Sequence, residues 1–313
     1  GDLGADHWVL DWVGFLPGKR ESRRYEGDVI VTQNDVRAEG RFEDLVAYGG
    51  WTMDDHHPGG VAWKGEPNIF HPAPSPFGIP YRALYSRNVA NLFCAGRNIS
   101  VTHAALSATR VMATCATVGQ AAGTAAAIAI REGKLPRDVA RDHIEELQQM
   151  LMDDDCYLPW HRRDVASLSR HATLSASTGD PEPLRNGLDR PTGEMDNGWL
   201  APLGAWVDYD FGAPTRLQGL RFTFDSDLNR TEKNTPANIP LDMAPVAPPA
   251  TLVRTFRVLA RHSDDDWHEV ARVENNYQRL VRIPLDITAR ALRLVPEATW
   301  GAPDVHIFAW DVN

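Results

Sequence analysis

The sequence predicts an α/β domain followed by an all-β sandwich. Helix-forming sequence is concentrated in the first half, where residues 110–133 form a long run of small side chains. From residue 172 onward the helical period is almost absent, and short alternating segments recur between turn residues. A length of 313 residues is enough for two domains. We therefore expect a first domain at residues 1–160, a linker at 161–171 and a second domain at 172–313.

The composition argues against some classes of partner. Hydrophobic residues make up 43% of the chain and charged residues 24%, as in ordinary globular proteins. The net charge of −10 argues against nucleic acid or an anionic membrane as a partner. The three cysteines have no CxxC or Cys/His spacing, so the sequence predicts free thiols and no metal site built on them. The compartment is not indicated by the sequence.

The N-terminal part predicts two short elements separated by a basic turn. Residues 1–16 mix tryptophan with aliphatic side chains, which is typical of a strand or short helix packed against a core. Pro17-Gly18 marks a turn, and a basic cluster follows at residues 19–24. Asp28–Gln33 predicts a strand, and residues 32–35 have the composition of a turn that caps a helix.

The next predicted strand carries an arginine. Residues 48–60 are polar, glycine-rich and aromatic, and residues 67–80 form a proline-rich loop. A strand is expected at residues 79–84, with Arg82 inside it. Such an arginine either pairs with a core carboxylate or reaches a cofactor or substrate, and both alternatives stay open.

A strand, a turn and a long helix are predicted in succession after Asn88. Val89–Ala95 has the length and composition of a buried strand, and Gly96 ends it. A polar loop is expected at residues 102–107, and the helix begins near Arg110. Its Gly119 and a second glycine four residues later lie on one face, which lets a backbone or a ligand come close.

Three interpretations compete for this helix. Residues 111–130 carry no charge and are long enough to cross a bilayer. They are mostly Ala, Gly and Thr and include Gln120, so we expect no membrane span. A buried core helix is the plainer interpretation. A ligand at its N-terminus would add to that, because free N–H groups and the helix dipole favour anionic or electron-rich groups there.

The remaining elements follow from their periodicity. Residues 136–152 predict one amphipathic helix with Val139, Ile144, Leu147 and Leu151 facing inward. The strands expected in the second domain are Trp206–Phe211, Leu217–Phe224, Val253–Arg261, Trp267–Val273, Gln278–Pro284, Ala291–Pro296 and Val305–Val312. Residues 234–249 form a proline-rich excursion that is too polar for a core.

Several sequence segments of the first domain resemble segments of the bacterial family labelled FAD-dependent oxidoreductase. They are PGKRESRR at residues 17–24, TQND at 32–35, AYGGWTMDDHHPGG at 47–60, IPYRALYSRNVANL at 79–92, and NLFCAGR with TRVMATCATVGQAAGTAAA within 91–127. The resemblance covers about residues 11–160. It implies a flavoprotein with a two-dinucleotide-binding-domain-like fold and FAD as its cofactor.

The resemblance also implies which residues approach the cofactor. In such proteins a strand that ends in glycine contacts the ribityl and pyrophosphate groups. The following helix aims its N-terminus at the flavin pyrimidine ring, and its internal glycine packs against the sheet. The implied cofactor-binding residues are Gly96, Arg97, Asn98, Ser107, Arg110, Val111, Met112 and Gly119.

Catalytic and substrate-binding roles are implied at a second set of residues. A flavin enzyme needs a proton acceptor near the substrate carbon, and histidine suits that role at neutral pH. The expected catalytic residues are His57, His103 and Arg82, and the expected substrate-binding residues are Arg20, Arg23 and His56. For each histidine, a hydrogen-bonded structural role is the alternative.

A metal site is also considered at residues 54–57, where two aspartates precede two histidines. Adjacent residues rarely converge on one ion, and no distant partner stands out, so we expect none.

One part of such an enzyme is absent from the sequence. Members of the group begin with a strand–GxGxxG–helix unit that holds the ADP half of FAD. No GxGxxG occurs in these 313 residues, and the first residue is Gly1. We therefore expect a C-terminal portion of a longer oxidoreductase, with an incomplete Rossmann-like domain. A split enzyme whose missing half is another chain is the alternative.

The second domain resembles discoidin-like, galactose-binding-like jelly rolls. The resemblance rests on LRNGLDRP, on NGWLAPLGAWVDYDFGAPTRLQGLRFTFDSDL and on the Asp-Phe-Gly at residues 210–212. That fold often binds glycans through aromatic side chains at loop tips, and Trp199 and Trp300 are the loop candidates. Trp206 and Trp310 are expected in the core. Asp225 and Asp227 are too few for a calcium site. Packing without a ligand is the alternative to glycan binding.

The sequence therefore predicts an FAD-dependent oxidoreductase portion with a jelly-roll accessory domain. The expected chemistry is hydride transfer between flavin and an organic, saccharide-related or other small-molecule substrate. A non-catalytic carbohydrate-binding protein with a remnant flavoprotein segment is the alternative.

Overall fold

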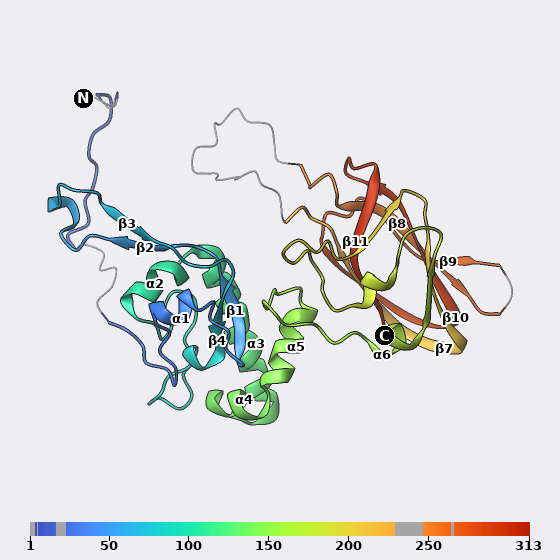
Figure 1. Ribbon diagram of the computed structural model, residues 1–313, viewed down its shortest axis with the longest axis horizontal. Helices are drawn as coiled ribbons and strands as arrows, with labels where there is room; N and C mark the ends of the chain where they lie inside the picture. Colours follow the sequence, from blue (N-terminus) through green and yellow to red (C-terminus); the bar gives the residue numbers. More distant parts are fainter. Residues whose placement is uncertain (1–3, 5, 17–22, 229–246, 264–265) are drawn as a thin grey trace. The chain divides into compact units, whose positions relative to one another are not determined.

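A computed structural model describes residue 4 and residues 6–16, 23–228, 247–263 and 266–313 of the chain (Figure 1). It divides into two compact units, Gly1–Ile144 and Glu145–Asn313. The first mixes helices with short strands, and the second is built mainly from strands, which confirms the predicted fold class. Arg20, the Pro17-Gly18 turn and most of the proline-rich excursion at 234–249 lie outside the described residues.

The first unit contains two small antiparallel sheets and four helices among its described residues. β1 pairs with β4, and β2 pairs with β3. The elements are α1 (Gln33–Arg37), β1 (Leu45–Gly49), β2 (Met53–His56), β3 (Asn68–His71), β4 (Phe77–Pro80), α2 (His103–Thr109), α3 (Met112–Glu132) and α4 (Pro136–Asp142), with 3-10 turns η1 (Gly60–Ala62) and η2 (Tyr81–Ala83).

The helix cap predicted at residues 32–35 is confirmed. The Asp35 N–H donates to Thr32 Oγ1 over 3.3 Å, and the Thr32 N–H donates to Asp35 Oδ2 over 2.8 Å. This reciprocal pair satisfies free N–H groups at the start of α1. The strand predicted just before it is reduced to a single parallel bridge between Val31 and Val101.

Helix α3 has one buried face and one exposed face. Thr114, Val118, Ala121, Ala122, Ala125, Ile128 and Ala129 are buried. On the opposite face Gly123 and Ile130 are exposed, and a Cβ at Gly119 or Gly123 would meet no atom within 4 Å. Among the described residues, α3 is the one helix long and apolar enough to cross a membrane. Its buried, small-residue face packs on β1, as expected for a core helix.

Three predictions for the first unit are wrong. Val89–Ala95 forms a turn segment in which Val89 is 45% exposed, because only Phe93 makes a bridge, to Tyr85. The expected polar loop at 102–107 is helix α2, since Thr102 caps it through the Ala105 N–H. The N-terminal stretch packs against no core in the described residues. Its large apolar side chains Trp8, Val9, Leu10, Trp12, Val13, Phe15 and Leu16 are 63–89% exposed.

The helix predicted at 136–152 is two helices. α4 ends at His143, whose φ of −137° leaves the helical region, and α5 (Ile144–Asp153) follows. Val139, Leu147 and Leu151 are buried as predicted, but Ile144 is only half-buried, because the second helix begins there after the break at His143.

The second unit is a β-sandwich whose strands belong to one continuous sheet. The strand order is β6-β11-β7-β10-β8-β9, and β5 pairs with β7 beside this path. After α5 come α6 (Ser167–His171), β5 (Thr173–Ala176), η3 (Glu182–Arg185), β6 (Trp199–Pro202), β7 (Val207–Phe224), β8 (Val253–Arg261), β9 (His268–Val273), β10 (Leu280–Thr299) and β11 (Asp304–Val312).

All seven strands predicted for this unit are strands, but they join in two places. Trp206–Phe211 and Leu217–Phe224 are the two halves of β7, and Gln278–Pro284 and Ala291–Pro296 belong to β10. Register shifts interrupt the pairing of β7 with β10 in the middle of both strands. Such irregularities bend long strands, which lets the two halves of the sheet face one another.

The core lies between these halves. Tyr209, from the first half of β7, packs against Trp310 of β11 at a ring distance of 4.7 Å, and its hydroxyl donates to the Trp310 carbonyl. Phe222, from the second half of β7, packs against Phe256 of β8 at 5.1 Å. Trp310 is fully buried, as predicted.

Trp199 corrects one prediction, because it is fully buried in β6 rather than placed at a loop tip. Its ring N–H donates to the Thr178 carbonyl over 2.9 Å. Trp300 is half-buried, and its ring N–H donates to the Asn276 carbonyl over 2.6 Å.

Candidate functional site

The turn at residues 96–98 forms a basic pocket in the first unit. Gly96 has φ +64°, and a Cβ built there would meet no atom within 4 Å. A left-handed conformation with open space favours glycine and permits close approach to the backbone. The pocket is lined by Arg23, Arg24, Tyr25, Arg97, Asn98, Ile99 and Leu106. The structure therefore brings three expected site residues, Arg23, Arg97 and Asn98, to one place.

One residue of this turn acts electrostatically on α3. Burial raises the pKa of the Cys115 thiol in the first turns of α3, and the charge of Arg97 acts in the opposite direction. Val111 precedes α3 without a side-chain cap, and Met112 is 88% exposed. The side chain of the cap residue thus accepts no hydrogen bond from the first N–H groups of the 21-residue helix α3.

A chain of three polar side chains runs beside the pocket. Arg24 Nη2 lies 3.1 Å from His103 Nδ1, and His103 Nε2 lies 2.9 Å from Asp55 Oδ1. The three residues come from different segments: Arg24 precedes α1, Asp55 lies on β2 and His103 opens α2. Because Arg24 also lines the pocket, the histidine is one side chain away from it.

A second cluster of polar side chains surrounds Asp54, which precedes Asp55 on β2. Arg110 donates to the Asp54 carbonyl over 2.7 Å, and its guanidinium lies 3.9 Å from the Asp54 carboxylate. His56 Nε2 is also 3.9 Å from that carboxylate, while His56 Nδ1 contacts Asn68 Oδ1 at 2.6 Å. Asp54 Oδ1 is a buried oxygen without a hydrogen-bond partner. Arg110 and His56 thus meet at one carboxylate.

Other expected site residues make local contacts. His57 stacks on Trp63 at 3.6 Å, and its Nδ1 accepts the Gly59 N–H. Arg82 donates two guanidinium hydrogen bonds of 3.0 Å to the buried Asp44 carboxylate.

Ser107 is also held locally, because it is 2% exposed and donates to the Ala104 carbonyl. The structure therefore does not bring His57, Arg82 or Ser107 into contact with the basic pocket. Gly119 lies within α3, on its open side.

Asp55 was not among the predicted site residues, and Arg24 was considered only as a member of the basic cluster at residues 19–24. Arg24 adjoins Arg23 in the basic cluster, and Asp55 adjoins His56 in the Asp-Asp-His-His run. Both stood inside the phrases that carry the family resemblance. Their role depends on contacts between segments far apart in the sequence, and the local sequence around each residue does not show these contacts.

Two observations fit a flavin in this region. The open space at Gly96 would admit a ligand against the backbone, and the uncapped start of α3 would face an electron-rich group. Within the described parts of the chain, no group of three or more His, Cys, Asp or Glu side chains could hold a metal ion.

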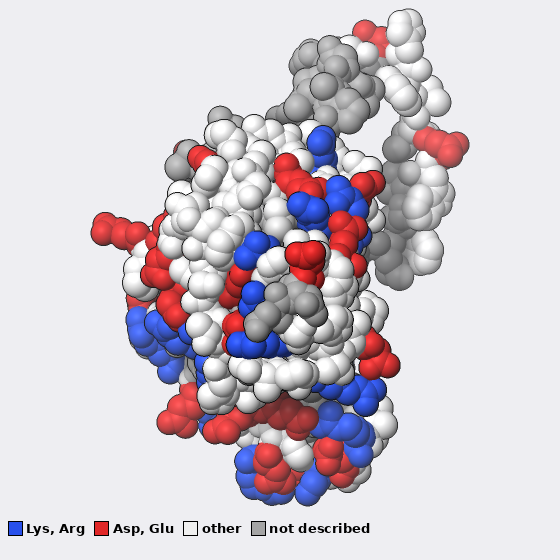
Figure 2. All heavy atoms as spheres, turned by 90° about the vertical axis from the view of Figure 1, so that its right-hand side faces the viewer, with Lys and Arg blue, Asp and Glu red and all other residues white. Residues whose placement is uncertain are grey.

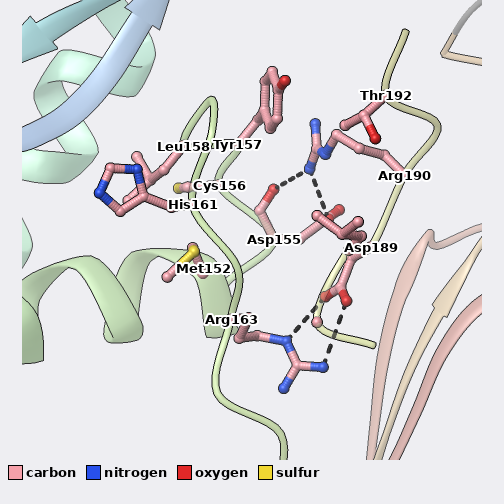
Figure 3. A pocket seen from close by; sticks show the side chains of 12 residues that line it. Met152, Asp155, Cys156, Tyr157, Leu158, His161, Arg163, Asp189, Arg190 and Thr192 are labelled. Atoms are coloured by element: carbon pink, nitrogen blue, oxygen red, sulfur yellow. Dashed lines mark hydrogen bonds and ion pairs between the residues drawn. The ribbon is translucent and has the colours of Figure 1, made fainter. Parts of the chain in front are cut away.

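The second unit has a pocket of a different kind (Figure 3). It lies between residues 152–163 and the loop at 187–192, and Cys156 lines it. Burial, with the charges of Asp154 and Asp155, raises the pKa of the Cys156 thiol to about 11. Since a thiolate is the reactive form, this cysteine is not an activated nucleophile. The Asp155–Arg190 pair at 3.0 Å closes one side of the pocket.

Charges of both signs are interspersed on the face of the molecule drawn in Figure 2. Acidic and basic side chains alternate there rather than gathering into a broad basic patch.

Comparison with known proteins connects this geometry to a family. Residues 3–151 match the family model described as FAD dependent oxidoreductase. No curated protein matches the chain. The matched segment contains the basic pocket, the Arg24–His103–Asp55 chain and all of α3.

Solved structures similar to this chain include several carbohydrate-binding modules. One is the family 32 carbohydrate-binding module from Streptococcus pneumoniae EndoD, at 18% identity over 47% of this chain and 99% of that chain, with a TM-score of 0.36. Another is the Streptococcus pneumoniae fucose binding module SpX-3, at 11% identity over 48% and 98%, with a TM-score of 0.35. A third is the family 32 module of C. perfringens NanJ in complex with galactose, at 14% identity over 47% and 97%, with a TM-score of 0.30.

These scores are low, and the sandwich fold of the second unit rests on its own strand pairing. The family match covers residues 3–151, which include both the glycine turn at 96–98 and helix α3. The chain is therefore similar, over residues 3–151, to the family described as FAD dependent oxidoreductase.

Proposed function

We propose that this chain contributes the flavin-facing part of an FAD-dependent oxidoreductase that transfers hydride between a small organic substrate and the flavin. The observation that carries the proposal is an open glycine turn at Gly96, followed by Arg97, which acts electrostatically on Cys115 near the uncapped start of α3, inside the segment that matches the family.

The residues of this region have separate roles in the proposal. The backbone at Gly96 lets the cofactor approach closely, and the first turn of α3 presents N–H groups to its electron-rich ring edge. Arg97 and Asn98, which follow Gly96, line the basic pocket, and Met112 at the start of α3 is 88% exposed. The bound cofactor would accept or give hydride.

The substrate side is assigned to the basic pocket. Arg23 and Arg97 bring two guanidinium groups to its lining, which suits a substrate with an anionic group. His103 lies next to the pocket through Arg24 and supplies the proton-transfer group. The contacts of His57 and Arg82 support structural roles for these two residues.

The experiment that tests this proposal compares two glycines. Gly96 and Gly133 both have positive φ, +64° and +62°, and open space around a built Cβ. Aspartate at either position therefore carries a similar backbone strain, but only Gly96→Asp places a charged side chain in the proposed flavin space. The variants are made in the protein expressed from the complete reading frame that contains this sequence, and flavin content is measured by absorbance.

Loss of FAD from Gly96→Asp with retention in Gly133→Asp is the expected result. Unchanged flavin content in a folded Gly96→Asp protein would remove the support for the cofactor assignment.

A second function, glycan binding, is favoured by one cluster on the sandwich. Tyr277 is 72% exposed, and it follows Asn276, whose carbonyl accepts the ring N–H of Trp300. The Arg254 guanidinium lies 5.7 Å from the Trp300 ring centre. Tyr277 thus presents an exposed aromatic ring and is next in sequence to the residue that holds Trp300, and such a ring is suited to stacking on a sugar.

A glycan array on the chain, repeated with Tyr277→Ala, tests this second function. We expect saturable binding that Tyr277→Ala weakens by more than about 1 kcal/mol, as for a contact residue at the centre of an interface. Phe70→Ala, which removes a 59% exposed ring from the first unit, serves as the control. An array without saturable hits would leave packing as the role of the sandwich.

A further inference from the structure

We propose that His103 accepts its proton at Nδ1, that Asp55 is its positioning residue, and that Arg24 covers Nδ1 until an anionic ligand draws the guanidinium away. The inference rests on the proposed function and deepens it, because it specifies an organic anion as the substrate class.

The first step is the assignment of protons on His103. An arginine side chain has donors only, so the 3.1 Å contact from Arg24 requires Nδ1 of His103 to be the acceptor. A neutral imidazole then carries its single proton on Nε2. That N–H donates to Asp55 Oδ1 over 2.9 Å. The two contacts therefore select one tautomer and one orientation of the ring.

The second step concerns what the ring can do in this arrangement. Nε2 is already protonated, so only Nδ1 can take up a further proton, and Arg24 occupies it. When Nδ1 accepts, the ligand's O–H or N–H bond breaks, its electron pair stays on the oxygen or nitrogen, and the new bond is Nδ1–H. The resulting imidazolium charge is offset by the Asp55 carboxylate at Nε2.

The third step is the link to an anion. Arg24 lines the same pocket as Arg23 and Arg97, so an anionic group in that pocket meets three guanidinium groups. Pairing of Arg24 with the anion competes directly with its hydrogen bond to His103. Anion binding thereby exposes the proton-accepting atom only when a ligand is present.

The test follows the histidine rings of the whole chain by ¹⁵N NMR. His103 is assigned by comparison with His103→Gln. The expected signature of the wild type is the neutral form protonated at Nε2. Asp55→Asn removes that preference, whereas Asp55→Glu, which keeps a carboxylate, restores it. His171 in the second unit, whose Nδ1 contacts Ser167, is the internal reference and stays unchanged.

The anion step is tested at fixed pH with inorganic phosphate in one arm and acetate in the other. Either anion is expected to move the wild-type His103 signals toward the protonated ring, and the stronger response identifies a phosphate-like or a carboxylate-like ligand. Arg24→Ala is expected to abolish the response. Arg41→Ala, which changes an exposed arginine paired with Glu39, leaves it intact.

Three results would overturn the inference: a wild-type His103 ring protonated at Nδ1, an unchanged tautomer in folded Asp55→Asn, or no response to either anion. None of these readouts needs FAD. If the NMR results are as expected but the Gly96→Asp protein keeps its flavin, the oxidoreductase proposal fails. The inference about His103 and anion binding is then supported without it.

Discussion

The guanidinium of Arg163 lies 2.7 Å from the carboxylate of Asp311, and both side chains are almost completely buried, at 3% and 2% exposure. Arg221 and Asp189 complete a four-membered network with distances of 2.9–3.4 Å. Arg163 comes from the segment that the sequence predicts as a linker, and Asp311 lies on the last strand. This segment is therefore held to the sandwich by buried charges.

Breaking this network should destabilise the second unit strongly. Asp311→Ala leaves Asp189 as the buried carboxylate of the network for both Arg163 and Arg221, with the half-exposed Asp153 3.7 Å from Arg163. An uncompensated buried charge typically costs about 3–5 kcal/mol. Urea unfolding monitored by tryptophan fluorescence measures the change in the free energy of unfolding.

The control for this prediction is an exposed pair of the same chemistry. Arg216 and Asp286 lie 3.0 Å apart with side chains 68% and 77% exposed. Asp286→Ala should cost no more than about 1 kcal/mol. Equal effects of Asp311→Ala and Asp286→Ala would show that burial does not govern the network.

The limits of the sandwich domain give a second prediction. Besides Arg163, the acidic turn at 153–155 pairs with arginines of the strands: Asp154 lies 2.7 Å from Arg282, and Asp155 lies 2.6 Å from Arg279. A chain of residues 145–313 should therefore unfold cooperatively and be clearly more stable than residues 172–313. Thermal melts of the two chains check this. A shorter chain as stable as the longer one would confine the domain to residues 172–313.

The pair of His306 and Asp225 predicts a dependence of stability on pH. Burial lowers the pKa of His306, but its hydrogen bond to the Asp225 carboxylate at 3.1 Å and the charge of Asp196 together raise it above its usual value. A folded pKa above the unfolded value of about 6.5 means that the stabilisation is complete below that pH. It is lost as the pH rises through the folded pKa.

The same pair also determines the pH below which this stabilisation is lost. Burial raises the pKa of Asp225, but its bond to His306 lowers it overall, so its stabilisation is lost only as the pH falls through that lowered pKa. The unfolding free energy should therefore decrease on going from pH 6 to pH 8, by an amount that His306→Gln reduces. A His306→Gln protein with the wild-type pH profile would contradict this.

Trp199 should behave as a core residue and not as a sugar-binding one. It is fully buried in β6, so Trp199→Ala should cost about 3–5 kcal/mol of stability. Any loss of glycan binding in that variant would follow from unfolding. Chemical denaturation of Trp199→Ala beside Tyr277→Ala distinguishes the two cases, because the exposed tyrosine should change stability by less than about 0.5 kcal/mol.

The sequence by itself determined the features that depend on local periodicity and on short motifs. The strands of the sandwich, the cap at residues 32–35 and the inward positions of the helix at 136–152 follow from patterns within a few residues. The glycine turn before a long helix of small residues was also predicted from the sequence. The amino acids of this segment are among those that resemble the family.

Only the tertiary structure decided which distant groups meet. The strand halves joined into β7 and β10 because the sheet bends at shifts of register, which alternation alone cannot reveal. Trp199 is in the core because β6 pairs with β11, although turn residues flank it in the sequence. Arg24, Asp55 and His103 form one chain because three segments converge. Which charges pair and which aromatic rings are buried depends on contacts between residues that are far apart in the sequence. The sequence specifies these contacts only through the complete fold.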